Sequence, residues 1–216
     1  MAPAAQRAAA AVKDRPRLLL VAQPGSYRIA PFLDAAGRMG LDVLIASRGE
    51  HSLISEVHDG LHIDLEDHES ALDVIIRNAH RHPLAGVLGI DDSTVELAAR
   101  VARLLGLPHN PPGAARLSRR KDLARSRLAR TGCPVPAHRL LNLEKSVAPQ
   151  AAGLSWPCVL KPLHLSASRG VIRADNMQQL LVACERIRPI IAGAGDEFER
   201  SHVLVERYIQ GVEIAY

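Results

Sequence analysis

The sequence predicts an α/β protein, with a doubly wound parallel sheet in its first half and an α+β region in its second. In the first half, short apolar runs such as Leu18–Ala22 alternate with segments of helical apolar spacing. Near the middle, Pro111-Pro112-Gly113 interrupts that alternation. With 216 residues, 47% of them hydrophobic, the chain can bury the cores of one to two domains.

The strands of the first half are expected to be covered on both faces, because their apolar runs are continuous rather than alternating. The predicted elements are strands at 18–22, 41–46, 61–65 and 84–90 and helices at 29–39, 69–80 and 91–105. Gly40 directly follows the first helix and ends it. Strands and helices that alternate at such short intervals imply parallel pairing through right-handed crossovers. We therefore predict a domain at 16–112, preceded by a disordered leader at 1–15, for which a transit peptide is the alternative.

The second region, 113–216, begins with a basic helix predicted at 114–130. The basic residues of this helix are Arg116, Arg119, Arg120, Lys121, Arg125, Arg127 and Arg130. A basic run is usually a solvated face, but at helical spacing these residues cannot share one face, so at least one could turn inward toward an anion. Thr131-Gly132 ends this helix. After a loosely composed connection, the sequence predicts a strand at 156–162, a helix at 176–188 and a last strand at 203–209.

The turn after the first strand does not carry a dinucleotide fingerprint. Gln23–Arg28 contains one glycine, whereas the G-x-G-x-x-G pattern needs three, so NAD is disfavoured. Ser26 and the turn Asp91-Asp92-Ser93-Thr94 follow predicted strands, where ligands of α/β sheets often bind. The alternative for these residues is ordinary turn and helix-cap chemistry.

Charge and composition favour a small anionic ligand over a nucleic acid. The net charge is +4, but 23 acidic residues are spread through the chain. Aromatic residues make up only 3%, too few to form a platform on which bases stack. No apolar run reaches transmembrane length, so we expect a cytoplasmic protein without a membrane partner.

Cysteine and histidine spacing does not predict a metal site. Cys133, Cys158 and Cys184 form no C-x-x-C pair, and their odd number argues against a disulfide framework. The histidine pairs, His58 with His62 and His80 with His82, have no evident third ligand.

The most informative segment is the apolar run Trp156–Pro162 together with the small-residue loop after it. The run delivers Lys161 to its far end, and Ser166-Ala-Ser-Arg-Gly170 follows shortly. A fixed cation, backbone N–H groups that can crowd an anion and a movable cover are the parts that hold a polyphosphate.

In the order of its motifs, the chain resembles the ATP-grasp superfamily, in particular carboxylate–amine ligases related to carbamoyl-phosphate synthase and L-amino-acid ligases. An α/β domain comes first, then a lysine-bearing helix that ends in Thr-Gly-Cys-Pro-Val-Pro, and then the strand Val159–Pro162. The Ser-rich loop and Val205-Glu-Arg-Tyr-Ile209, followed by Gly211 and Glu213, complete the order. The resemblance implies a pre-ATP-grasp doubly wound parallel sheet followed by a partial ATP-grasp α+β domain.

The resemblance also implies roles for individual residues. Lys161 and Lys121 would contact the ATP phosphates, although Arg119 or Arg120 could occupy the family position that is assigned to Lys121. Ser166, Ser168, Arg169, Gly170 and Val171 would form the phosphate-covering loop. The backbone of Glu206, Arg207, Tyr208 and Ile209 would pair with the adenine edge, and Glu213 would accept from the ribose hydroxyls. The alternatives are a strand-end lysine that reaches water for Lys161, a helix-surface charge for Lys121 and a plain hairpin for Glu206 and Glu213.

The implied function is activation of a small-molecule carboxylate by ATP as an acylphosphate, which an amine or similar nucleophile then attacks. Mg²⁺ is expected for a full-length member of the family. Its ligands would lie on strands downstream of Glu206–Ile209, the hinge strand, and these strands have no counterpart before Tyr216. We therefore expect a fragment of a longer ligase, with little or no ATP turnover by itself and with no assigned catalytic residue. A homo-oligomer is compatible with the resemblance. The alternative is a non-catalytic nucleotide-binding or structural remnant.

Overall fold

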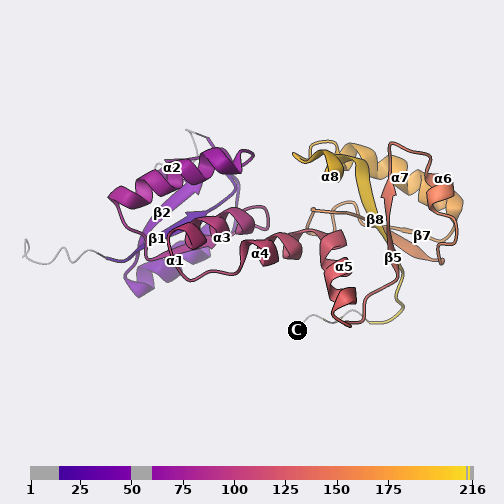
Figure 1. The fold of residues 1–216 in the computed structure, drawn as a ribbon, viewed down its shortest axis with the longest axis horizontal. Coiled ribbons are helices and arrows are strands. Elements are labelled where there is room, and N and C mark those ends of the chain that lie inside the picture. The colour runs from indigo at the N-terminus through magenta and orange to yellow at the C-terminus, as the bar shows by residue number, and fades with distance from the viewer. Residues whose placement is uncertain (1–14, 50–59, 213, 215–216) are drawn as a thin grey trace, which may run out of the picture. The chain divides into compact units, whose positions relative to one another are not determined.

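The computed structural model describes residues 15–49, 60–212 and 214 and divides into two compact units, Met1–Arg116 and Leu117–Tyr216 (Figure 1). The predicted leader lies, up to residue 14, outside the described residues. The segment Pro111-Pro112-Gly113, which interrupts the alternation of strands and helices, leads into helix α4 (Pro112–Arg119). Proline is compatible with the first helical turn, where its missing N–H would have no partner in the helix.

The first unit is a parallel sheet with helices on both faces. Its elements are β1 (Arg17–Val21), α1 (Ile29–Met39), β2 (Asp42–Ser47), β3 (Gly60–His62), α2 (His68–Arg81), β4 (Gly86–Gly89) and α3 (Val95–Leu104). The strand order is β3-β2-β1-β4, and every neighbouring pair is parallel. The doubly wound sheet predicted from the sequence is therefore confirmed.

The run Leu19–Ala22, in and just after β1, is apolar throughout because its alternate residues pack on opposite faces of the sheet. Leu19 and Val21 pack with side chains of α2 and α3, whereas Leu20 and Ala22 pack with α1 on the opposite face. All four side chains are fully buried. A central parallel strand needs apolar residues at every position for this reason.

The second unit contains an antiparallel sheet of strand order β5-β8-β6-β7. Its elements are α5 (Lys121–Arg130), β5 (His138–Asn142), α6 (Val147–Gln150), β6 (Cys158–Pro162), β7 (Ile172–Ala174), α7 (Met177–Ile191), α8 (Glu197–Ser201) and β8 (His202–Arg207). The mixed α/β class is thereby confirmed, including the α+β character of the second half.

Three sequence predictions for this unit were wrong in detail. The helix predicted at 114–130 is two helices, because Arg120 has extended backbone angles (φ −96°, ψ 103°) and separates α4 from α5. The predicted strands were too long, since β6 begins at Cys158 and β8 ends at Arg207. The strands β5 and β7 and the helices α6 and α8 were not predicted, because each is too short to show a clear apolar period.

The two faces of the second sheet have different chemistry. One face packs against α7, through Cys158 and Leu160 of β6 and Val203 and Val205 of β8. The opposite face carries the alternate residues, which are Val159 and Lys161 of β6 and Leu204 and Glu206 of β8. We call this second surface the polar face.

Candidate functional site

Lys161 and Glu206 meet on the polar face of the second sheet. The antiparallel pairing of β6 with β8 sets Val159 opposite Glu206 and Lys161 opposite Leu204, so the two charged residues are diagonal neighbours. The Lys161 Nζ donates to Glu206 Oε2 over 2.5 Å. Glu206 is only 2% exposed, so the structure uses the predicted phosphate lysine as the partner of a buried carboxylate.

Arg125 of α5 provides a second cation for the same carboxylate. Its Nε donates to Glu206 Oε1 over 2.6 Å. Burial raises the pKa of Glu206, but the hydrogen bonds from Lys161 and Arg125 outweigh burial and hold it below the ordinary value. Sequence reasoning allowed one basic residue of this helix to turn inward without identifying it. The available signal was the four-residue spacing from Lys121, which places Arg125 on the same helix side.

Lys121 is the first residue of α5 and connects this helix to the segment after β6. Its backbone N–H donates to the Leu163 carbonyl over 3.1 Å, and its Nζ donates to the Leu165 carbonyl. The N-terminus of the helix that carries Arg125 is therefore hydrogen-bonded to Leu163 and Leu165, just before the predicted phosphate loop.

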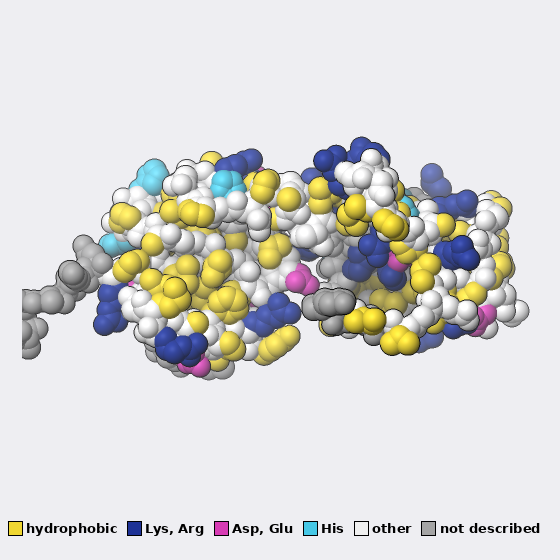
Figure 2. Space-filling model, turned by 90° about the horizontal axis from the view of Figure 1, so that it is seen from below, with side chains coloured by type: hydrophobic (Ala, Val, Ile, Leu, Met, Phe, Trp, Pro, Cys, Tyr) yellow, Lys and Arg dark blue, Asp and Glu magenta, His cyan; other side chains and the backbone are white. Residues whose placement is uncertain are grey.

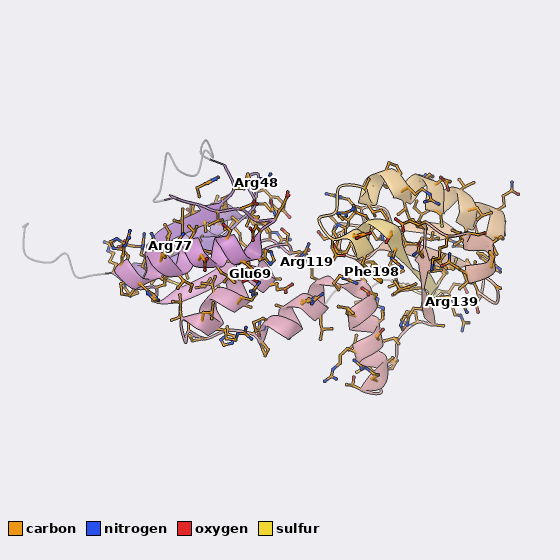
Figure 3. The ribbon with its side chains drawn as sticks, turned by 45° about the horizontal axis from the view of Figure 1, so that its top comes forward. Arg48, Glu69, Arg77, Arg119, Arg139 and Phe198 are labelled. Atoms are coloured by element: carbon orange, nitrogen blue, oxygen red, sulfur yellow. The ribbon has the colours of Figure 1, made fainter. Side chains whose placement is uncertain are left out.

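Arg120, an alternative to Lys121 in the sequence analysis, belongs to a buried charge cluster. Its guanidinium donates to both Asp122 carboxylate oxygens over 2.9 Å and lies 3.6 Å from Glu199 of α8. The same guanidinium lies 5.3 Å from the centre of the Phe198 ring, which Figure 3 labels. Burial lowers the pKa of Arg120, but the Asp122 carboxylate more than offsets burial, and the net direction is upward.

His164 lies at the other side of Glu199, just before the loop. Its Nδ1 is 3.2 Å from Glu199 Oε2 but makes no hydrogen bond there. Burial, followed by the charges of Arg119 and Lys121, lowers the pKa of His164 to about 4. The imidazole is therefore neutral near pH 7, and the contact with Glu199 is not an ion pair.

The loop after β6 has a tightly turned backbone with exposed side chains. Ser166, Ser168 and Arg169 are all exposed, and two turn hydrogen bonds of 3.2 Å connect Arg169 to Ser166 and Val171 to Ser168. Ala167 and Ser168 have left-handed φ values of 52° and 57°. Sequence reasoning expected Gly170 to allow a close approach to an anion. In the structure the close neighbour is Pro162, whose Cγ would lie 2.7 Å from a Cβ at Gly170.

The backbone N–H groups from Arg207 to Ile209, at the end of β8 and just after it, differ in whether they already have an acceptor. The Arg207 N–H donates to the Ala137 carbonyl over 2.8 Å, and the Tyr208 N–H donates to the Pro157 carbonyl over 3.0 Å. The Ile209 N–H, in contrast, has no hydrogen-bond acceptor within the described chain. Arg173 of β7, which the sequence did not indicate, lies 4.5 Å from the centre of the Tyr208 ring. Glu213 lies outside the described residues.

The polar side chains in the turns after β1 and β4 of the first unit form hydrogen bonds within and between these turns. Asp91 accepts from the Gln23 N–H and from the Ser26 hydroxyl, each over 2.8 Å. The Thr94 hydroxyl donates to the Val21 carbonyl over 2.9 Å. These bonds connect the turn after β1 with the turn after β4, which favours the turn-and-cap interpretation of these residues.

In residues 15–49, 60–212 and 214, no group of three His, Cys, Asp or Glu side chains is arranged to hold a metal ion. His58 lies outside these ranges. Cys133 is exposed, whereas Cys158 and Cys184 are buried, and all are free thiols. None of the described helices has the length and apolarity needed to cross a membrane. Lys and Arg side chains gather over several parts of the second unit (Figure 2).

Comparison with protein families gives two matches, one in each half of the chain. The family model described as the ATP-grasp N-terminal domain matches residues 33–109. The model described as the ATP-grasp domain matches residues 154–216. Together the matched segments include more than half of the chain, and they occur in the order that the motifs predict.

Among curated proteins, the chain is similar to a D-alanine–D-alanine ligase of Geobacter sulfurreducens, at 30% identity over 126 residues. That alignment covers 57% of this chain and 36% of the ligase. A D-alanine–D-alanine ligase of Pseudomonas entomophila is also 30% identical, over 50% of this chain and 32% of its own length. The chain therefore aligns with about a third of the length of these relatives.

Among solved structures, an L-amino acid ligase from Bacillus licheniformis superposes with a TM-score of 0.70 at 24% identity. It covers 91% of this chain, which in turn covers 45% of the ligase. The ADP complex of N5-carboxyaminoimidazole ribonucleotide synthetase gives a TM-score of 0.66 at 14% identity, covering 90% of this chain and 48% of that one. At these identities the likeness establishes the fold.

Proposed function

Because the chain belongs to the ATP-grasp superfamily, we propose that its second unit binds ATP on the polar face, as the nucleotide-binding part of an ATP-dependent ligase. In such a ligase the carboxylate oxygen of a small substrate attacks the γ-phosphorus and ADP leaves. An amine or similar nucleophile then displaces phosphate from the acylphosphate. The substrate classes follow from the ligases that this chain resembles.

The observation that carries the proposal is the pairing of β6 with β8. It sets the Lys161 ammonium on the same face as Val159, a half-buried apolar side chain that lies beside the cation, while Leu204 on that face is fully buried. A purine ring needs apolar contact, and a polyphosphate needs a cation, so the two requirements are met next to each other.

The adenine edge has a defined place in this proposal. Since the Arg207 and Tyr208 N–H groups already donate to backbone carbonyls, the Ile209 N–H is the hinge donor that can pair with a ring nitrogen. This narrows the segment Glu206–Ile209, which the sequence predicted as a whole, to the backbone that follows Tyr208.

The phosphates would lie among cations from two segments. Lys121 and Lys161 supply ammonium groups, and the exposed Arg169 supplies a guanidinium on the loop. The backbone of Ser166, Ser168, Gly170 and Val171 would cover the phosphates. Bound ATP supplies the phosphoryl group, while these residues bind it, orient it and neutralise its charge.

Magnesium is part of the family's chemistry, but no cluster suited to a metal ion occurs within residues 15–49, 60–212 and 214. We therefore assign no metal ligand to this chain and no reaction step to a metal that it holds. The neutralisation of the phosphates rests, in this proposal, on Lys121, Lys161 and Arg169.

Calorimetric titration with ATP tests the proposal. Lys161→Met should weaken ATP binding about 10- to 100-fold, because one charge-assisted contact to phosphate is lost. Lys145→Met is the matched control, since Lys145 is exposed in the turn between β5 and α6, and its loss should leave the affinity unchanged. NAD should not compete. A wild-type chain that does not bind ATP, or a Lys161→Met variant with wild-type affinity, would refute the assignment.

The second candidate is nucleotide binding without turnover by these 216 residues. Measurement of ADP release with and without Mg²⁺ separates the two. ATP binding without release supports a nucleotide-binding part alone. Mg²⁺-dependent release supports ligase chemistry within this chain.

A further inference from the structure

Glu206 is held by two cations that come from different parts of the second unit. Lys161 of β6 donates to Oε2 and Arg125 of α5 donates to Oε1. The Glu206 side chain is 3% exposed, while Lys161 and Arg125 are 24% and 29% exposed. The carboxylate is therefore inaccessible to water, whereas each of the two cations is partly exposed to water.

This arrangement opposes the use of Lys161 by a nucleotide. To reach a phosphate, the ammonium must turn away from Glu206 or share its protons with a second anion. A buried carboxylate that loses its partner is strongly destabilised, because neither water nor another donor replaces the lost bond. With Lys161 as its sole partner, Glu206 would hold the ammonium in place.

Arg125 removes this obstacle. Its guanidinium has five N–H donors in a rigid fork, of which Nε already contacts Oε1. When Lys161 turns away, a terminal N–H of the same guanidinium can take over Oε2 and complete a bidentate pair. Glu206 then stays ionised and paired while the ammonium is free.

We propose that Arg125 is a positioning residue that releases Lys161 for phosphate binding by keeping Glu206 paired, an inference that rests on the proposed ATP site. Arg125 does not itself touch the nucleotide. Its place on α5, one helical turn after Lys121, links this function to the helix whose first residue anchors the phosphate loop.

The test is a set of ATP affinities, measured by calorimetry for the 216-residue chain at a temperature where every variant is folded. Arg125→Met should weaken ATP binding about tenfold, because Glu206 then competes with the phosphates for Lys161. In a Glu206→Gln background, the same substitution should cost less than about threefold, because no carboxylate remains to hold the ammonium. Arg127→Met, which removes an exposed arginine of the same helix, controls for the change in net charge.

Arg125→Lys provides a conservative variant that keeps a charge beside Glu206. It should bind ATP more tightly than Arg125→Met, and it replaces that variant in the comparison if the methionine protein does not fold. An equal loss from Arg125→Met in both backgrounds would overturn the inference, because a purely structural role is not relieved by removing the carboxylate. Wild-type affinity in Arg125→Met would overturn it as well. A wild-type chain that does not bind ATP would instead refute the proposed function.

Discussion

Glu206→Gln should destabilise the second unit by about 2–4 kcal/mol near neutral pH. The change keeps the size of the side chain but removes the charge that Lys161 and Arg125 share. A hydrogen bond to a charged group contributes about 1.5–3 kcal/mol, and breaking a buried pair costs about 3–5 kcal/mol. Both cations are about a quarter exposed, so water can solvate them once the carboxylate is gone. The expected loss of stability is therefore smaller than that for breaking a fully buried pair.

Urea unfolding followed by tryptophan fluorescence measures this change. Trp156 is the single tryptophan of the chain and lies two residues before β6, so its emission reports the unit that contains Glu206. Glu185→Gln is the control. It breaks the exposed pair of Glu185 with Arg188 and should cost less than about 0.5 kcal/mol.

The pH dependence gives an independent check. Burial raises the pKa of Glu206, but the hydrogen bonds from Lys161 and Arg125 hold it below its ordinary value, so its stabilisation is present above the unfolded-state pKa and is lost as the pH falls through the lower folded-state pKa. Glu206→Gln should therefore reduce the loss of stability in acid. A Glu206→Gln protein within about 0.5 kcal/mol of wild type at pH 7 would refute the assigned role of the pair.

Two further substitutions test Gly170 in the predicted phosphate loop and His164 just before it. Gly170→Ala should destabilise the second unit by about 1–3 kcal/mol in urea unfolding, because φ is +72° and the new Cβ would lie 2.7 Å from Pro162 Cγ. For His164, the folded-state pKa of about 4 predicts a stabilisation that is complete above pH 6.5 and falls by up to about 3 kcal/mol as the pH approaches 4, since only the unfolded imidazole takes up the proton readily. His164→Asn should remove that dependence, which unfolding curves at several pH values measure.

Each of these changes has its own control. Gly153→Ala has a similar φ of +75° but open space around the new Cβ, so it should cost less than Gly170→Ala. Equal costs at the two glycines would mean that the contact with Pro162 does not matter. Parallel stability curves of wild type and His164→Asn between pH 6.5 and 4 would contradict the depressed pKa of His164. Burial raises the pKa of neighbouring Glu199, which makes it less costly to protonate and opposes the loss caused by His164.

Much of the first unit could be predicted from local patterns. The run Leu18–Val21 is apolar because both faces of β1 are covered, and Gly40 ends α1 with a left-handed φ of 68°. Such features depend on a few consecutive residues, so periodicity and turn chemistry identify them. The second unit was harder, because β7 has three residues and α6 has four, too few to establish a period.

The candidate site was predicted as a set of residues, while its contacts were not. Lys161 and the loop after it are recognisable because their order along the chain is specific. That Lys161 donates to Glu206, 45 residues later, follows from the register of β6 against β8. Arg120 shows the same limit, since it was expected within a continuous helix but interrupts it to pair with Asp122 and Glu199.

By itself, the sequence determined the doubly wound first unit, the family and the candidate phosphate-binding residues. The tertiary structure alone decided which cation neutralises which anion. Arg125 and Glu206 are 81 residues apart, and the fold brings the Arg125 side chain of α5 to the Glu206 carboxylate on β8. Periodicity and turn signals act between near neighbours in the chain, whereas the partner of a buried charge depends on which distant segments fold against it.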